Sequence, residues 1–524
     1  MIILRNLLTY SAIIFVILSN SGVGIAQELI SLEKPAKKGD RPEVSFPAPV
    51  SNPEKGETQI VQTEENSPAV ATEATPAPEE VNPSANPLIF PTEPDEVNIE
   101  TVYPVTLNQA IEVALNNNKE LQAARLQLER TQSQLDEALA ALWPTLDAEF
   151  NFIQQDSATS RLSREVQIQQ FGQSNIETDD TRIDGGLNLR YDIYTGGQRG
   201  ATIRRTRRQL EVNRLEVERI AEQTRFDATS NYYDLQNADA TVAIVQAAVE
   251  DATQSLRDAQ LLEQAGLGTR FDVLQAEVDL ANENQRLTRA IAQQRTARRQ
   301  LAETLSIAQR IELTAADEIN TAGSWPLSLE ESIVQAYQNR AELEQFLIQR
   351  EIGEQNREIA LAGIRPTIGV QASYDVADDL QENVTIEDGY TLGVNARWVF
   401  FDGGAAKAQA EQANRDIDIA EVNFANQRNE IRLQVESAYF EYIANQENIG
   451  TTDTAVTTAE ERLRLARLRF QAGVGTQTDV INAQRALSEA RGNFLQAIIG
   501  YNQALNQLQR SVSNLPDNGL FEQR

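Results

Sequence analysis

The sequence predicts an α+β membrane protein made of two tandem repeats, each with two transmembrane β-strands and long coiled-coil helices. Three observations predict this fold. Sequence patterns recur at fixed offsets, four segments of roughly ten residues alternate between apolar and polar side chains, and two stretches of 69 residues, 198–266 and 405–473, contain no proline. The first observation gives the repeats, the second gives the strands and the third gives the helices.

The repeats are visible as two constant offsets. Residues 142–146 (LWPTL) match residues 364–368 (IRPTI) at an offset of 222, and residues 265–269 (AGLGT) match 472–476 (AGVGT) at an offset of 207. The difference, 222 − 207 = 15, is extra length in one loop of the first repeat. Self-similarity of this kind indicates duplicated structural units. The two repeats are expected at residues 105–315 and 316–515.

The ends of the chain differ from the repeats. Residues 1–26 combine a basic Arg5 with an apolar run and a small-residue site, which predicts a cleaved signal peptide; an uncleaved membrane anchor is the alternative. Residues 27–104 are acidic and hold 13 of the 17 prolines, which predicts a disordered linker. That linker is either a tether to the cell wall or to partners, or a solvated spacer. Residues 516–524 are expected to form a C-terminal tail.

The alternating segments predict two strands in each repeat. Tyr390, Leu392 and Val394 share one face of such a segment, while Thr391 and Asn395 lie on the other. Roughly ten residues of alternation suit a barrel strand between lipid and water, although a half-buried sheet of a soluble domain gives the same pattern. The expected strands are about 145–155 and 183–194 in repeat 1, and about 367–375 and 389–400 in repeat 2. Polar loops are expected between the paired strands, at about 155–182 and 376–388.

The proline-free stretches predict unusually long helices. They are rich in Ala, Gln, Glu, Arg and Leu, and at 1.5 Å per residue each would be about 100 Å long. Their apolar residues are sparse and mostly small, which favours coiled-coil packing. Glycine then ends each long helix, and a return helix follows. The expected helices are 197–265 and 269–305 in repeat 1, and 404–472 and 476–512 in repeat 2.

The number of strands predicts that several copies assemble. One chain supplies four strands, whereas the smallest bacterial membrane barrels have eight, and an open sheet edge cannot face lipid. Several copies must therefore contribute to one barrel. Three copies give 12 strands, which is wide enough for a water-filled lumen. The helices would then continue that lumen as a hollow tunnel.

Composition excludes several classes of function. The chain has no Cys and no His, so it has no thiol chemistry, no Cys/His zinc site and no His-dependent catalytic triad. It also has no phosphate-binding Gly-Lys-Ser/Thr loop, and we therefore expect no enzyme activity and no cofactor. A formal net charge of −31 makes the chain a poor partner for nucleic acid, which is itself a polyanion.

From about residue 105 to 512, the chain resembles the TolC family of outer-membrane efflux proteins. The resemblance rests on the twofold repeat, on the Gly-Gly ends of the second strands (194–197 and 400–404) and on the helical-turn motifs at 268–274 and 475–481. It implies a homotrimer in the outer membrane of a Gram-negative-type cell. In that trimer a 12-stranded barrel spans the membrane and the helices project into the periplasm.

The same resemblance implies a passive channel-tunnel for efflux or type I secretion. Its implied partners are outer-membrane lipid, a periplasmic membrane-fusion adaptor, and an inner-membrane RND pump or ABC exporter. The alternative function is a periplasm-spanning coiled-coil scaffold without a pore, which would not account for four alternating strands at matched positions.

The two helical turns are the candidate functional sites. In the family, the equivalent turns meet the adaptor and form the closed periplasmic entrance. A second glycine in each turn lets another backbone come close, whereas a plain helix stop is the alternative reason for these glycines. The predicted docking residues are Gly266, Leu267, Gly268 and Thr269 in the first turn, and Gly473, Val474, Gly475 and Thr476 in the second.

Asp272 and Asp479 are the predicted gate acids, because three copies of each would ring a narrow opening and attract cations. Their spacing from the preceding threonines also fits helix caps, and the two roles can coexist. The chain departs from the family pattern at Gln477, where an arginine often helps to lock the gate, and at Asn482. Arg270 of the other turn is the predicted replacement for the missing cation.

Overall fold

The structure is a computed structural model, and it describes Leu88 and residues 90–99, 101–173, 179–308, 310–379 and 386–512. Three predicted segments fall largely beyond these ranges. The predicted signal peptide at 1–26, most of the predicted linker at 27–104 and the predicted tail at 516–524 lie outside the described residues.

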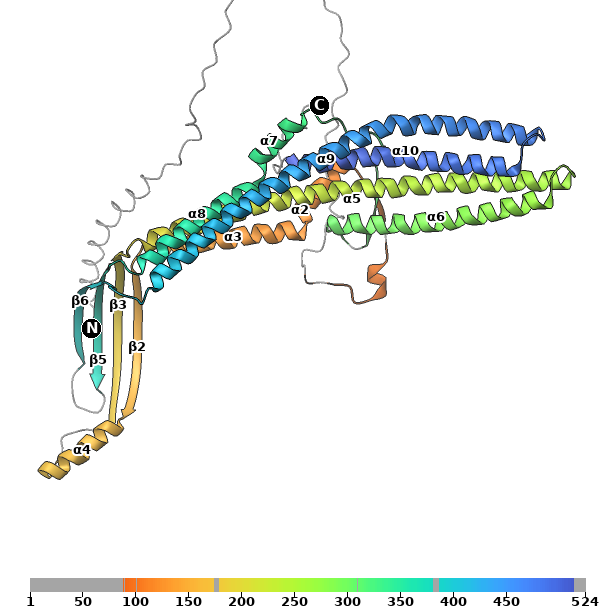
Figure 1. The fold of residues 1–524 in the computed structure, drawn as a ribbon. Helices are drawn as coiled ribbons and strands as arrows, with labels where there is room; N and C mark the ends of the chain where they lie inside the picture. Colours follow the sequence, from red (N-terminus) through yellow and green to blue (C-terminus); the bar gives the residue numbers. More distant parts are fainter. Residues whose placement is uncertain are drawn as a thin grey trace, which may run out of the picture. The chain divides into compact units, whose positions relative to one another are not determined.

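The same order of elements occurs twice along the chain: two helices, two strands, a long helix and a return helix (Figure 1). The first set is α2 (Leu107–Asn117), α3 (Lys119–Ala140), β2 (Thr145–Asp156), β3 (Asp179–Tyr194), α5 (Gln198–Gln264) and α6 (Arg270–Thr304). The second set is α7 (Leu329–Asn339), α8 (Ala341–Ala362), β5 (Thr367–Asp379), β6 (Glu387–Arg397), α9 (Ala405–Gln471) and α10 (Gln477–Val512). The long helices α5 and α9 have 67 residues each, which corresponds to about 100 Å.

The four long strands form one antiparallel sheet in the order β2-β3-β5-β6 (Figure 1). Thr145 lies opposite Arg190 in the β2–β3 pair, and Thr367 lies opposite Arg397 in the β5–β6 pair, so the two hairpins of the sheet share one register. The alternation leaves large apolar side chains such as that of Phe150 exposed on one face. Within the described residues, β2 and β6 are edge strands, and each carries a row of unpaired backbone groups.

The loop between β2 and β3 contains a helix that the sequence did not predict. We expected a polar loop over about 155–182, but α4 (Ala158–Phe171) occupies much of it, and β3 begins at Asp179. Arg161 in the first turn of α4 donates two hydrogen bonds to Asp156 at the end of β2, at 2.8 and 2.5 Å. This stretch has no Gly or Pro before Gly172, so nothing in it opposes a helix.

A second, two-stranded sheet joins the start of the first repeat to the link between the repeats. β1 (Thr101–Val105) pairs in parallel with β4 (Ile311–Ala315), and a short 3-10 helix, η2 (Pro94–Val97), precedes it. Residues 101–104 were assigned to the linker from sequence. They form a strand because Val105 and the partly buried Tyr103 pack on a buried cluster that includes Leu313.

The apolar core is concentrated in two clusters away from the helical turns. One surrounds Tyr232 of α5, and the other surrounds Trp325, Tyr442 of α9 and Tyr501 of α10. Near the first turn the core shrinks to Ala and Val side chains, as expected for helices with sparse, small apolar residues. Within the described part of the chain, no helix is both long enough and apolar enough to cross a bilayer.

Candidate functional site

The candidate site comprises the two helical turns and the contact between the hairpins that carry them. In the first turn, Gly266 has a φ of +72°, its N–H donates to the carbonyl of Glu263, and the N–H of Leu267 donates to the carbonyl of Leu262, both at 2.9 Å. This is a Schellman motif, which satisfies the last carbonyls of the helix and requires a left-handed residue. The second turn repeats the motif around Gly473, whose φ is +71°.

The second glycine of each turn has a role inside the hairpin. A Cβ atom added at Gly268 would lie 3.1 Å from Cβ of Leu262, and one added at Gly475 would lie 3.1 Å from Cβ of Arg469. The chain therefore needs a glycine there in order to pass close to its own helix end. The sequence left two roles open for this glycine, docking of a partner and a plain helix stop. The turn gives it a role of its own, and docking stays a prediction.

Asp272 and Asp479 both cap the return helices. Asp272 Oδ2 accepts hydrogen bonds from the N–H of Thr269 at 3.0 Å and from its hydroxyl at 2.6 Å, and the N–H of Asp272 donates back to that hydroxyl. Thr476 and Asp479 form the same reciprocal set, with distances of 3.0, 2.8 and 3.2 Å. The N–H and hydroxyl of Thr476 stabilise the carboxylate and lower the pKa of Asp479.

The remaining predicted residues at the turns have different surroundings. Leu267 and Val474 are exposed at the tips, and Arg270 lies 3.9 Å from Glu263 of its own hairpin. Gln477 is only 1% exposed, and neither its amide oxygen nor its amide nitrogen has a hydrogen-bond partner among the described residues. The amide of Gln477 is thus buried in the hairpin at an energetic cost.

The two hairpins contact each other along what we call the hairpin joint, where α10 packs on α5 and α6. Four helices lie side by side here in the order α9, α10, α5, α6 (Figure 1). Two ion pairs cross the joint: Arg485 of α10 with Asp279 of α6 at 2.5 Å, and Arg467 of α9 with Asp251 of α5 at 2.6 Å. The Asp279 side chain is 5% exposed, so removing Arg485 would leave a buried carboxylate without its ion-pair partner.

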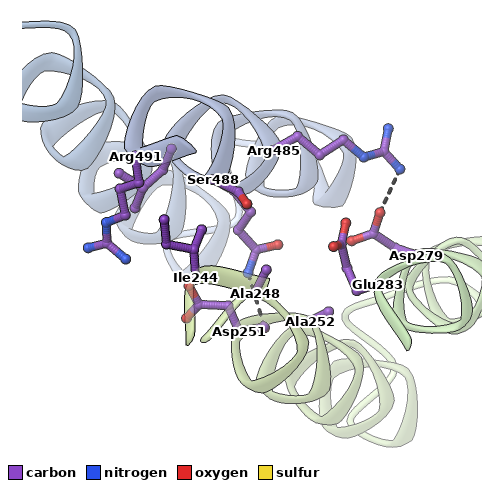
Figure 2. Close-up of a pocket in the computed structure, with 11 residues that line it drawn as sticks. Ile244, Ala248, Asp251, Ala252, Asp279, Glu283, Arg485, Ser488 and Arg491 are labelled. Atoms are coloured by element: carbon purple, nitrogen blue, oxygen red, sulfur yellow. Dashed lines mark hydrogen bonds and ion pairs between the residues drawn. The ribbon is translucent and has the colours of Figure 1, made fainter. Parts of the chain in front are cut away.

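A small cavity lies at the joint (Figure 2). Gln484 donates to the carbonyl of Asp251 at 3.1 Å and accepts from the Ser255 hydroxyl at 3.3 Å. Glu283 lies beside Asp279, and its Oε1 accepts from Arg286 at 3.0 Å, whereas its Oε2 is buried without a hydrogen-bond partner among the described residues. Burial raises the pKa of Glu283. The water-accessible volume of about 20 Å³ is enough for one water molecule.

Charged and amide side chains line the cavity at the joint together with the apolar side chains of Ile244 and Leu487. Polar groups such as Glu283 Oε2 are thus buried among apolar neighbours, which costs free energy when they lack a partner. Among the described residues, no group of three or more carboxylates is arranged to hold a metal ion.

Sequence reasoning missed the joint itself. Asp279, Glu283, Gln484 and Arg485 are ordinary members of polar helices in the sequence. Only the folded structure buries the first three and places the half-exposed Arg485 beside Asp279. A weak signal was available, because Asp279 follows the capping Asp272 by seven residues and so returns to the same side of a coiled-coil helix.

Comparison with known proteins identifies the family. The family model described as outer membrane efflux protein matches residues 110–306 and 332–514. The chain is 25% identical over 186 residues to the outer membrane efflux protein BepC of Brucella suis biovar 1 (strain 1330), covering 36% of this chain and 40% of that protein. It is 22% identical over 207 residues to the outer membrane protein TolC of Vibrio cholerae serotype O1 (strain ATCC 39315 / El Tor Inaba N16961). This match covers 37% of this chain and 46% of that protein. The chain thus spans less than half the length of these two relatives.

The fold also matches a solved structure. The crystal structure of the Campylobacter jejuni CmeC outer membrane channel superposes with a TM-score of 0.67 at 16% identity, covering 83% of this chain and 95% of that one. The resemblance predicted from the repeats and turns is confirmed, and the family is one of channels rather than of enzymes. Because the matched residues make up more than half of its length, the chain belongs to the outer membrane efflux protein family and is an outer-membrane protein.

Proposed function

We propose that the protein is a passive outer-membrane channel-tunnel for efflux or type I secretion. Three copies join their four-stranded sheets into a 12-stranded barrel, and their helices continue the lumen into the periplasm. The observation that carries this proposal is the four-stranded sheet with two open edges, β2 and β6. An open edge is not tolerated in hydrocarbon, so the edge of one copy pairs with that of the next.

The helical turns are proposed as the entrance of the channel. A periplasmic membrane-fusion adaptor docks at Gly266–Thr269 and Gly473–Thr476, where Leu267 and Val474 offer exposed apolar side chains. An inner-membrane RND pump or ABC exporter delivers the cargo and supplies the energy. The hairpins then splay apart at the joint, and cargo diffuses outward.

Asp272 and Asp479 are proposed as gate acids in addition to their role as helix caps. In a trimer they place six carboxylates around the entrance, where they favour cations in the lumen. Arg270 is proposed to moderate this charge, from its place beside Glu263 in the first hairpin.

Planar-bilayer recording of the purified protein tests the proposal. We expect trimers that resist dissociation in detergent and that conduct ions, with cation preference reduced in Asp272→Asn/Asp479→Asn. Asp453→Asn, which changes an exposed acid of α9 far from the turn, is the matched control and should leave selectivity unchanged. Absence of pores, even with the adaptor present, would leave a scaffold without a pore as the better account.

A further inference from the structure

The helix α4, in the loop between β2 and β3, is an addition to the first repeat. The two offsets between the repeats differ by 15 residues, and α4 has 14 residues, so this helix accounts for the extra length. In the second repeat only residues 380–386 separate β5 from β6, too few for a helix of this size. Figure 1 shows α4 at the end of the four-stranded sheet that lies opposite to the long helices. Since those helices project into the periplasm, α4 belongs to the outer side of the membrane.

The length of β2 places the start of α4 at the level of the lipid headgroups. Trp143, two residues before β2, and Trp398, directly after β6, are exposed where the sheet meets the helices, as expected for an aromatic girdle at the inner boundary of the membrane. From there β2 runs for 12 residues, which is about 40 Å of strand, and a tilt of roughly 40° leaves about 30 Å across the membrane. The outward apolar band of such barrels is about 25 Å tall, so α4 begins roughly 5 Å beyond the hydrocarbon.

An ion pair decides which face of α4 turns toward the membrane. Asp156, the last residue of β2, lies on the same face of the strand as Phe150 and Phe152, whose exposed side chains belong to the apolar face of the sheet. Arg161 of α4 binds both carboxylate oxygens of Asp156, at 2.8 and 2.5 Å. The face of α4 that carries Arg161 therefore turns back toward the outer end of this apolar face.

That face of α4 combines basic and apolar side chains. Residues at spacings of three, four and three share this side of the helix: Arg161, Arg164, Ile168 and Phe171. Ile168 and Phe171 are 43% and 73% exposed, and Arg164 is exposed and forms no ion pair within the described part of the chain. Arginine beside large apolar side chains on one helix face is typical of a helix that lies in a membrane interface.

We propose that α4 binds the phosphate-bearing headgroups of the outer-leaflet lipid. Arg164 contacts lipid phosphate, and Ile168 and Phe171 insert beside the upper ends of the acyl chains. Two observations support lipid as the occupant: the apolar face of the sheet ends where this face of α4 begins, and a phosphate matches the fork of an arginine. The inference rests on the proposed barrel, because only strands that cross the membrane bring α4 to its surface.

Fluorescent labels on single cysteines test this arrangement, since the chain has no native cysteine. The full-length protein with Phe171→Cys, Leu162→Cys or Val394→Cys is labelled with nitrobenzoxadiazole and reconstituted into vesicles of phosphatidylglycerol and phosphatidylcholine. We expect lipid with a nitroxide near its headgroup to quench the label at position 171. Leu162 lies on the opposite side of α4, so the label there is the matched control and should be quenched by iodide in the water. The label at position 394, on the apolar face of β6, should be quenched by a nitroxide deep in the acyl chains.

Moving the arginine gives an independent readout with the label at position 171. Arg164→Ser should weaken the association of α4 with the anionic lipid surface by on the order of fivefold, which is the effect of one cation, and lipid quenching should fall. Ser163→Arg/Arg164→Ser keeps the charge of the helix but moves the cation about 100° around it, and it should not restore the quenching. Full restoration would reduce the contact to an effect of net charge and overturn the assigned face.

The label at position 394 separates failure of this inference from failure of the barrel. If lipid quenches that label while the label at position 171 stays in water, the lipid contact of α4 is wrong and the barrel stands. If the label at position 394 is itself in water, both are wrong. A label at position 171 that neither lipid nor iodide reaches would place α4 over the mouth of the barrel instead.

Discussion

At the scale of single residues, the two turns depend on glycines in a left-handed conformation. A Cβ atom at Gly473 would meet no other atom within 4 Å, so Gly473→Ala should cost only backbone strain, about 1–2 kcal/mol. Urea unfolding followed by helical circular dichroism should show the hairpin of α9 and α10 unfolding at a lower urea concentration. Gly450→Ala is the control: this residue lies inside α9 with free space around it, and alanine should stabilise the helix by about 0.5–1 kcal/mol. Equal effects of the two substitutions would contradict this account of the turn.

Glu283 should make the hairpin joint sensitive to pH. Burial raises its pKa, so the folded state holds the proton more tightly than the unfolded chain does. Stability contributed by the protonated form is present at low pH and is lost as pH rises through the folded pKa. Glu283→Gln should therefore match the natural protein at about pH 4 and become relatively more stable as pH rises toward about pH 8.

Unfolding curves measured at several pH values check this expectation. Glu447→Gln, at an exposed position of α9, serves as the control and should not change the pH dependence. A Glu283→Gln variant that loses stability at high pH would show that the carboxylate finds a partner in the assembled protein.

At the scale of elements, the joint between the hairpins decides how easily they separate. Arg485→Met leaves Asp279 buried and without its ion-pair partner. This should weaken the α6–α10 contact by about 1–3 kcal/mol. The loss is smaller where water reaches Asp279 past the half-exposed side chain at position 485. Single-channel recordings should then show longer open times. Arg464→Met breaks an exposed pair with Glu461. It should cost little stability, because water screens exposed ion pairs, and it should leave gating unchanged. Similar open times in both variants would show that the Arg485–Asp279 ion pair does not hold the two hairpins together.

At the scale of the whole molecule, the two hairpins must keep the same length. Deleting one heptad from each arm of both hairpins (244–250, 284–290, 451–457 and 491–497) should shorten them by about 10 Å while keeping every helix face in register. We expect trimers and pores to survive, while export that depends on partners is lost.

Deletion of 451–457 and 491–497 alone should behave differently. It shifts Arg485 by about 10 Å along α6 and away from Asp279, so trimers on unheated gels should become scarce. If deleting a heptad from one hairpin gave the same yield of trimer as deleting it from both, the two hairpins would not need to have the same length.

The sequence predicted the elements well where local periodicity governs them, and less well where distant residues pair. It missed α4 because polar residues without Gly or Pro fit either a loop or a helix, and the contact between Arg161 and Asp156 selects the helix. It missed the β1–β4 pair because that sheet joins segments more than 200 residues apart. It did not predict the close approach of Gly268 to Leu262, because that contact depends on how the turn folds.

By itself, the sequence determined the two repeats, because the same patterns recur along it. It also determined the alternating strands, the long helices and the turns that end them, because these depend on residues a few positions apart in the chain. Only the tertiary structure decided which of two matching helix faces is covered. Ile481 and Leu274 hold equivalent places in similar helices, yet one is buried and the other exposed. The physical reason is that a helix face is buried only where another helix packs against it. α10 has α5 beside it, whereas α6 lies at the outer side of the row.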